Sequence, residues 1–148
     1  MNYSLHPACP EDLQTILSWV GTTDLFRQWA GPFLGFPGTS ESVWSAIGAT
    51  PENAFSLFDS AGELVGFGQA YVRDPNVHVA RLIVAPSRRG QGLGRILTMK
   101  LIQEAITRHP DGITLKAYSN QAPTVSLFNS LTFATMPLAQ RAESFQPA

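Results

Sequence analysis

The amino-acid sequence predicts a mixed α/β (α+β) fold built as one domain. Strand-like and helix-like patterns succeed one another in the order strand, helices, three strands, helix, strand, helix, strand. The 148 residues suffice to bury a core without disulfides or metals. Since no repeat, low-complexity tract or linker interrupts the chain, we expect a single domain over residues 1–148.

The composition gives the chain no strong overall charge. Ten basic residues stand against eleven acidic ones, and hydrophobic residues make up 44%. Such a balance attracts neither nucleic acid nor an anionic membrane, so we expect neither as a partner. Cys9 is the single cysteine, which excludes an intramolecular disulfide and a cysteine-rich zinc site, and we expect no metal. The first residues lack a basic segment followed by an apolar run, so we expect a cytoplasmic protein.

The first predicted elements are a short strand and a helix. Residues Asn2–His6 have a strand-like pattern, which Pro7–Pro10 interrupts. The helix that follows ends at Gly21 and carries apolar residues at the spacing of one buried face. These residues are Leu13, Ile16, Leu17 and Val20.

Two more short helices are predicted before residue 50. Phe26 and Trp29 are spaced as one face of a helix, and a loop rich in Gly, Pro and aromatic residues follows them. Ser40 is expected to cap the next helix, because Ser is a preferred N-cap residue. Its inward residues would be Val43, Trp44 and Ile47.

The middle of the chain predicts a three-stranded meander. Ala54–Asp59 and Leu64–Arg73 form a hairpin, and a further turn leads into the apolar strand Val77–Val84. Gly66 and Gly68 lie inside the second strand. Glycines there usually mark a bulge or a close approach of another backbone segment.

The third strand runs directly into a glycine-rich turn and an amphipathic helix. Pro86 closes the strand, and three glycines alternate within Ser87–Arg95. Glycine permits positive φ and removes the Cβ that would keep a ligand off the backbone. The free amides and the dipole at the start of the helix favour an anion, and Arg88, Arg89 and Arg95 add positive charge. This unit predicts a phosphate-binding site.

The remaining patterns are shorter. The long helix ends near His109, and Gly112–Ala117 is the next predicted strand. A short helix is expected at Ala122–Leu131 and a terminal strand region at Phe133–Phe145.

The glycine pattern resembles the acyl-CoA signature of the GCN5-related N-acetyltransferase (GNAT) family. The glycines run G-x-G-x-G, which matches neither the dinucleotide fingerprint nor the phosphate loop of nucleotide-binding proteins. In the family the signature is [QR]-x-x-G-x-[GA], and Arg89, Gly92 and Gly94 fill its fixed positions. Val84-Ala85-Pro86 supplies the V-x-P pattern that ends the preceding strand. The resemblance covers most of the chain.

The resemblance implies a fold and a cosubstrate. It implies a central, mostly antiparallel sheet with helices on both faces and one parallel strand pair that splays apart. The cosubstrate would be acetyl-CoA, with its pantetheine arm between the splayed strands. The residues implied to bind it are Leu82, Ile83, Val84, Arg89, Gly90, Gln91, Gly92, Leu93, Gly94, Arg95 and Asn120.

The chemistry needs a neutral amine, and an ordinary lysine with a pKa of about 10.4 is protonated at pH 7. The family often carries a glutamate as base where His78 stands, and a histidine can accept a proton near neutrality. His78 is therefore the candidate catalytic residue. Its alternative interpretation is a structural histidine with a satisfied ring nitrogen.

The proton donor is less clear from the residues. Phe128 stands where many family members carry the tyrosine that protonates the leaving thiolate. Thr132 replaces a glycine of the same segment, and Gln121 falls at the asparagine position, one residue after Asn120. The alternative donors are Tyr118, Ser119 and water.

The acceptor site is implied by the family, which places the segment after the first helix over the substrate cleft. Arg27, Trp29 and Phe33 are the candidates, although the aromatic residues could simply pack on the sheet. The segment Thr22–Phe36 contains only Asp24 as an acid, which favours an acceptor with an apolar portion or a peptide end.

The leading hypothesis is an acetyl-CoA-dependent N-acetyltransferase that moves an acetyl group to a primary amine by direct attack. The acceptor would be a small molecule or a peptide end, and a homodimer through the terminal strand region is one option. The alternative is an acyl-CoA-binding or regulatory domain with little catalysis, which Phe128 motivates. A nucleotide-binding α/β protein is the third hypothesis.

Overall fold

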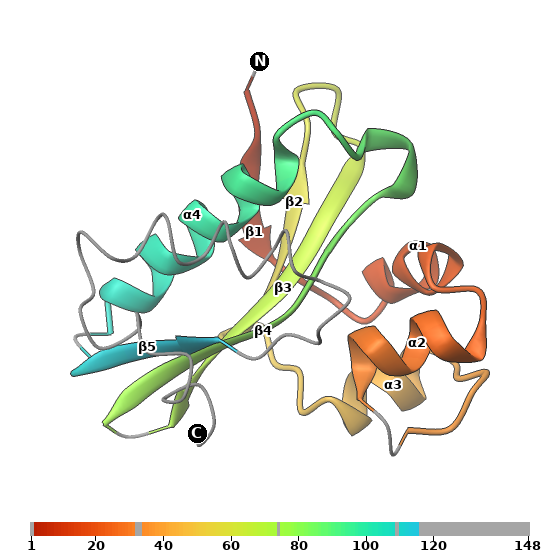
Figure 1. Ribbon diagram of the computed structural model, residues 1–148, viewed down its shortest axis with the longest axis horizontal. Helices are drawn as coiled ribbons and strands as arrows, with labels where there is room; N and C mark the ends of the chain where they lie inside the picture. The colour runs from red at the N-terminus through yellow and green to blue at the C-terminus, as the bar shows by residue number, and fades with distance from the viewer. Residues whose placement is uncertain (1, 32–33, 74, 109, 116–148) are drawn as a thin grey trace.

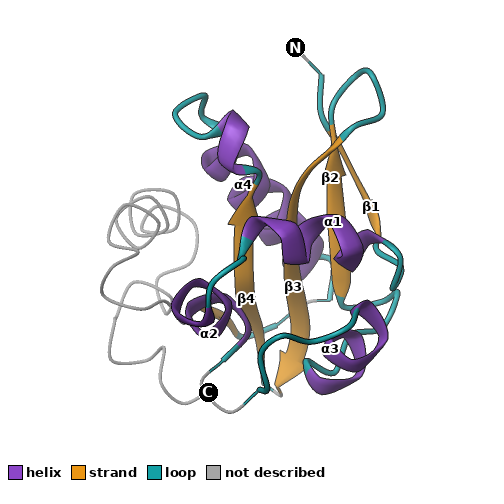
Figure 2. Ribbon diagram, turned by 90° about the vertical axis from the view of Figure 1, so that its right-hand side faces the viewer, coloured by secondary structure: helices purple, strands orange, loops and turns teal. Residues whose placement is uncertain are grey.

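A computed structural model describes residues 2–31, 34–73, 75–108 and 110–115. In these residues a five-stranded sheet has one helix on one face and three helices on the other (Figures 1 and 2). The strands are β1 (Ser4–Pro7), β2 (Ala54–Phe58), β3 (Leu64–Arg73), β4 (Asn76–Val84) and β5 (Gly112–Leu115). The helices are α1 (Asp12–Trp19), α2 (Thr23–Ala30), α3 (Ser40–Ala46) and α4 (Leu93–Ile106).

The sheet has the strand order β1-β2-β3-β4-β5. Every neighbouring pair is antiparallel except β4 and β5, which are parallel. The mostly antiparallel sheet with one parallel pair is therefore confirmed. The helix predicted at 122–131 and the strand region predicted at 133–145 lie outside the described residues.

Two apolar cores lie on the two faces of the sheet. Helix α4 packs on β3 and β4 through a stripe of side chains spaced four residues apart, while α1, α2 and α3 cover the other face. The α4 stripe is Leu93, Leu97, Leu101 and Ala105. On the other face Leu13 and Ile16 are fully buried, as the helical spacing predicts.

Strand β4 contains one more residue than β3 opposite it. The register passes from Phe67–Ile83 to Gln69–Ala80, so two residues of β4 face Gly68. The extra residue is accommodated at Arg81, whose φ of 55° lies in the left-handed region. The bulge predicted at the β3 glycines is confirmed opposite Gly68. The neighbour that approaches Gly68 closely is a side chain, since a Cβ built there would lie 2.5 Å from Leu101 Cδ1.

The extra residue changes which side chains of β4 face α4. Before it, Val77 and Val79 belong to the core beneath α4; after it, Leu82 and Val84 pack against that core. Ile83 belongs to the core under α1–α3. The odd positions thus face α4 at one end of the strand and the even positions at the other.

The N-cap of α3 corrects the sequence prediction by one residue. Thr39, not Ser40, is the cap: its Oγ1 accepts a hydrogen bond from the Ser42 amide at 3.0 Å. The Ser42 hydroxyl in turn accepts from the Thr39 amide at 2.9 Å. This reciprocal pair satisfies two backbone donors, which a cap at Ser40 would not do.

Candidate functional site

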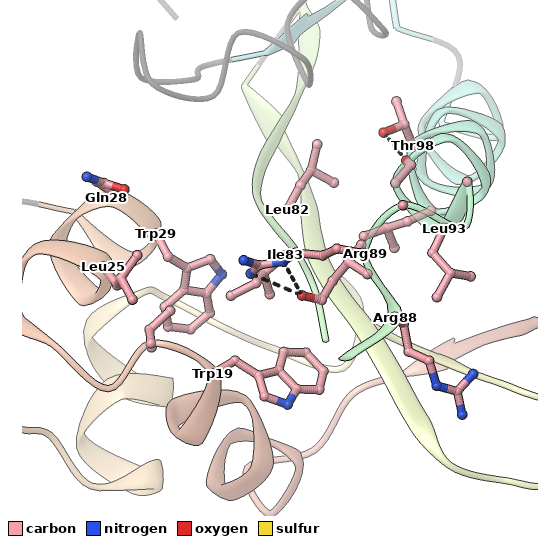
Figure 3. Close-up of a pocket in the computed structure, with 16 residues that line it drawn as sticks. Trp19, Leu25, Gln28, Trp29, Leu82, Ile83, Arg88, Arg89, Leu93 and Thr98 are labelled. Atoms are coloured by element: carbon pink, nitrogen blue, oxygen red, sulfur yellow. Dashed lines mark hydrogen bonds between the residues drawn. The ribbon is translucent and has the colours of Figure 1, made fainter. Parts of the chain in front are cut away.

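A cavity of about 590 Å³ lies beside the end of β4, between α1 and α2 on one side and the start of α4 on the other (Figure 3). It is therefore enclosed by three parts of the chain that are far apart in sequence. One wall comes from the two N-terminal helices, the second from β4, and the third from the glycine-rich turn and α4.

The β4 wall consists of Leu82, Ile83 and Val84. Within the described residues, β4 pairs with β5 only from Asn76 to Val79. Beyond that point β4 is paired with β3 alone in this part of the chain. The last residues of the strand thus line the cavity at an edge that β5 does not cover among the residues described.

The glycine-rich turn begins with a single turn of 3-10 helix, Pro86–Arg88. Gly90 and Gly92 follow with φ values of 83° and 79°, which favour glycine. No heavy atom lies within 4 Å of a Cβ built on either of them, so the backbone conformation, not crowding, calls for glycine. Gly92 is the N-cap of α4 and offers no side chain to its first amides. An anion can satisfy those amides instead.

The three arginines of this region differ in what they contact. Arg88 lines the cavity, but its Nη2 pairs with Asp59 at 2.7 Å and Glu63 at 3.0 Å. The sequence predicts that this charge contributes to the phosphate site, but in the structure two carboxylates of the β2–β3 turn balance it. Arg88 therefore ties the glycine-rich turn to that hairpin.

The partner of this ion pair is held by several donors. Asp59 Oδ1 accepts from the amides of Ala61 and Glu63, each at 2.9 Å. The Glu63 amide and, after it, the Arg88 guanidinium hold the pKa of Asp59 below its usual range. The hydrogen bond to Asp59 raises the pKa of Arg88 further.

Arg89 carries the charge that stays unbalanced in the cavity lining. Its Nε and Nη2 both donate to the Val84 carbonyl at 3.3 Å (Figure 3). No carboxylate pairs with it among the described residues. Of the other residues predicted for this region, Gly90, Gly92, Leu93 and Gly94 line the cavity, whereas Gln91 and Arg95 are exposed outside the lining. Asn120 lies outside the described residues.

The helix wall contains one of the three predicted acceptor residues. Trp29 lines the cavity, its indole Nε1 donating to the Arg81 carbonyl at 2.8 Å. Arg27 is exposed and does not line the cavity, and Phe33 lies outside the described residues. The other residues of this wall are Trp19, Val20, Leu25 and Gln28.

Arg81 is a residue that the sequence analysis missed. Its Nε donates to the Ala30 carbonyl at 3.1 Å, and its Nη1 donates to Gln69 Oε1 at 2.9 Å. It thereby links α2, β3 and the bulge of β4. No local pattern marks it, because each partner is at least 12 residues away in sequence.

His78 lies on β4 before the bulge and is 2% exposed. Its Nδ1 lies 2.7 Å from Thr114 Oγ1 on β5, and its ring packs on Tyr71 of β3 at 5.4 Å between centroids. It is not part of the cavity lining in the described residues. Its role as a base stays a prediction, and Phe128 lies outside the described residues.

The described residues contain neither a metal-binding cluster nor a membrane-spanning helix. No group of three or more His, Cys, Asp or Glu side chains could hold a metal ion there. No helix in the same part of the chain is long and apolar enough to cross a membrane.

Comparison with known proteins gives a family and a fold. The sequence model of the family described as "Acetyltransferase (GNAT) family" matches residues 23–133. The ribosomal-protein-S18-alanine N-acetyltransferase from Escherichia coli is similar, with 22% identity and a TM-score of 0.65 over 88% of this chain and 77% of that chain. A phosphinothricin acetyltransferase from Sinorhizobium meliloti in complex with AcCoA has 17% identity and a TM-score of 0.66, covering 89% and 75%.

A spermidine N-acetyltransferase from Vibrio cholerae, in complex with CoA and spermine, has 16% identity. Its TM-score is 0.68, with 88% of this chain and 79% of that chain covered. At these identities the likeness concerns the fold. The matching family model spans most of the chain, including the glycine-rich turn and α4, and the chain belongs to the GNAT family of acetyltransferases.

Proposed function

We propose that the protein is an N-acetyltransferase that moves the acetyl group of acetyl-CoA to a primary amine by direct attack. The observation that carries the proposal is a single cavity with two unlike ends. At one end lie the uncapped amides of α4, two left-handed glycines and the unpaired charge of Arg89. At the other end lies the apolar wall of α1 and α2.

The residues of the first end fit the phosphates of a coenzyme A thioester. Backbone amides from Arg89 to Arg95 would hold the diphosphate, because a helix N-terminus and a fixed cation both favour an anion. The backbone of Leu82–Val84 would bind the pantetheine amides, and Asn120 completes the proposed set. When bound, the thioester supplies an activated acetyl group: the C–N bond to the amine forms as the C–S bond breaks.

The protein's part in the chemistry is to orient the amine and take up its proton. In this proposal His78 accepts that proton, because a histidine changes charge near neutral pH. His78 is buried and does not line the cavity among the described residues. The proton therefore reaches its ring by way of the neighbouring side chains, Thr114 and Tyr71. The leaving thiolate is protonated by water or by Tyr118 or Ser119.

A second candidate function is acyl-CoA binding with little catalysis. The sequence favours it at one position, Phe128, where the family's proton-donating tyrosine would stand. The two functions differ in one measurable respect: a catalyst accelerates thioester cleavage when an amine is added, whereas a binding domain does not.

The test is isothermal titration of acetyl-CoA and of CoA into the wild type and two variants. Gly92→Glu places a carboxylate where the diphosphate would lie and should abolish binding. Gly48→Glu is the matched control, because Gly48 also has positive φ, also has no neighbour within 4 Å of a built Cβ, and does not line the cavity. Absence of binding by the wild type, or equal loss in both variants, would contradict the proposed function.

A further inference from the structure

We infer that the acceptor is a primary amine with one positive charge and an apolar body, and that the cavity discriminates against polycations. This inference rests on the proposed function, and it identifies the helix wall as the part of the cavity that selects the acceptor. The wall is formed by Trp19, Val20, Leu25, Gln28 and Trp29. Apart from the indole N–H groups of the two tryptophans, the polar group of this wall is the neutral amide of Gln28.

Leu25 shows that this wall presents apolar surface without internal cover. It is 44% exposed although it is a large hydrophobic residue on an otherwise well-packed helix. On the same helix Phe26 and Ala30 are buried in the core beneath it. An apolar ligand that covered Leu25 would remove this surface from water, which is favourable in proportion to the area covered.

Trp29 is held in one orientation by the structure behind it. Its indole Nε1 donates to the Arg81 carbonyl, and its ring meets Phe67 edge to face at a centroid distance of 5.9 Å. The guanidinium of Arg81 fastens the end of the same helix through the Ala30 carbonyl. Because the indole N–H is already used, Trp29 offers carbon atoms and no donor to a ligand. The wall is thus preorganised for an apolar group.

No carboxylate lines the cavity among the described residues. Asp59 and Glu63 pair with Arg88, and Asp12 accepts from the Ser56 hydroxyl at 2.8 Å. Asp24 lies in the first turn of α2 and does not line the cavity. The residues outside the described ranges contribute only Asp74 and Glu143 as further acids. The described residues that line the cavity therefore offer a polyamine or an aminoglycoside no carboxylate.

The charge that does line the cavity is positive. In the proposed complex Arg89 faces the diphosphate at the end of the cavity opposite the helix wall, so it offers the acceptor no partner. A second ammonium group on the acceptor would lose water against the apolar wall without gaining an ion pair from the described lining residues, which costs free energy. The one amine that the reaction requires loses its proton for the attack, whereas a second ammonium group would stay charged and is disfavoured.

The experiment compares n-hexylamine with 1,6-diaminohexane, which have the same carbon chain and differ by one charge. Each is titrated calorimetrically into the wild type saturated with CoA, and each is assayed as an acceptor with acetyl-CoA. We expect n-hexylamine to bind about tenfold more tightly and to have the larger kcat/KM. Equal or tighter binding of the diamine, or binding of neither amine, would overturn the inference.

Leucinamide and 3-methylbutylamine separate a peptide end from a small amine, because they share an apolar body and differ in the carboxamide. Tighter binding of either one than of 1,6-diaminohexane supports the inference. Weaker binding of both contradicts it. Loss of acetyl-CoA binding itself would instead count against the proposed function, so the two failures are distinguishable.

A charge introduced into the wall gives a second, independent test. Leu25→Glu places a carboxylate at an exposed position where folding tolerates it, and Leu25→Gln is the control of the same shape without the charge. We expect Leu25→Glu to raise the affinity for the diamine about threefold to fivefold over Leu25→Gln, the effect of an exposed ion pair. An unchanged preference in Leu25→Glu would show that this wall does not face the acceptor.

Discussion

Replacing Gly68 by alanine tests the packing that holds β4 against α4. A Cβ at this position would lie 2.5 Å from Leu101 Cδ1 and 3.0 Å from Leu82 Cδ2, whereas carbon atoms prefer about 3.5–4.0 Å. Leu101 is fully buried, so it can move aside only by displacing its neighbours. Overpacking of this kind costs about 1–3 kcal/mol.

The alanine also restricts the unfolded chain, which offsets about 0.4–1 kcal/mol of that cost. We therefore expect Gly68→Ala to lower the free energy of unfolding by about 1–2 kcal/mol. Urea denaturation followed by tryptophan fluorescence measures it. Because Leu82 is one of the two displaced side chains and lines the cavity, the same variant should bind acetyl-CoA more weakly.

Gly66→Ala is the matched control, two residues away on the same strand. A Cβ there would meet the Ile83 carbonyl and Leu57 at 3.4 Å, which is ordinary contact. This variant should unfold at the same urea concentration as the wild type or slightly higher. If Gly68→Ala proved as stable as Gly66→Ala, the close approach of α4 to β3 would be refuted.

Three more predictions concern single side chains. Asp59 has a lowered pKa when folded, so its contribution to stability is present above the pKa of the unfolded chain and is lost as the pH falls through the folded value. In urea titrations at decreasing pH, the free energy of unfolding should therefore fall less steeply for Asp59→Asn than for the wild type. Trp29→Phe removes the donor to the Arg81 carbonyl and should cost about 1–3 kcal/mol, whereas Trp44→Phe should cost less in the same assay. If His78 is the base, His78→Gln should abolish the acidic limb of the kcat/KM profile against pH; an unchanged profile would show that His78 is not the base and would favour a structural role beside Thr114 and Tyr71.

The conformation of the glycine-rich turn could be predicted from the sequence because its cause is local. Positive φ at Gly90 and Gly92 and the start of α4 directly after them depend on adjacent residues. The pairing of Arg88 with Asp59 could not be predicted in this way, since 29 residues separate them and only the fold brings them together. Of the three arginines in this cluster, Arg88 is anchored by carboxylates, Arg89 lines the cavity without a carboxylate partner among the described residues, and Arg95 is exposed outside the lining.

The bulge of β4 shows a second limit of sequence patterns. The glycines of β3 indicated irregular geometry, but the residue with unusual φ is Arg81, on the neighbouring strand. An arginine gives no signal for the left-handed region, and its conformation is held by Ala30 and Gln69. Similarly, the choice of Thr39 over Ser40 as helix cap depended on the hydroxyl of Ser42. When two neighbouring residues are equally suited to cap a helix, the hydrogen-bond partner that each finds in the fold decides which one does so.

The extra residue of β4 makes the chain unequally tolerant of insertions and deletions. Removing one residue at Arg81 would shift every later side chain of the strand to the opposite face. Leu82 and Val84 would then turn away from α4, and Ile83 would turn toward it. A length change in the exposed turn at Gly62 would not change which face of the sheet the β4 side chains point to. Among homologous sequences, length changes should accumulate in that turn, while the number of residues between Val77 and Pro86 stays constant.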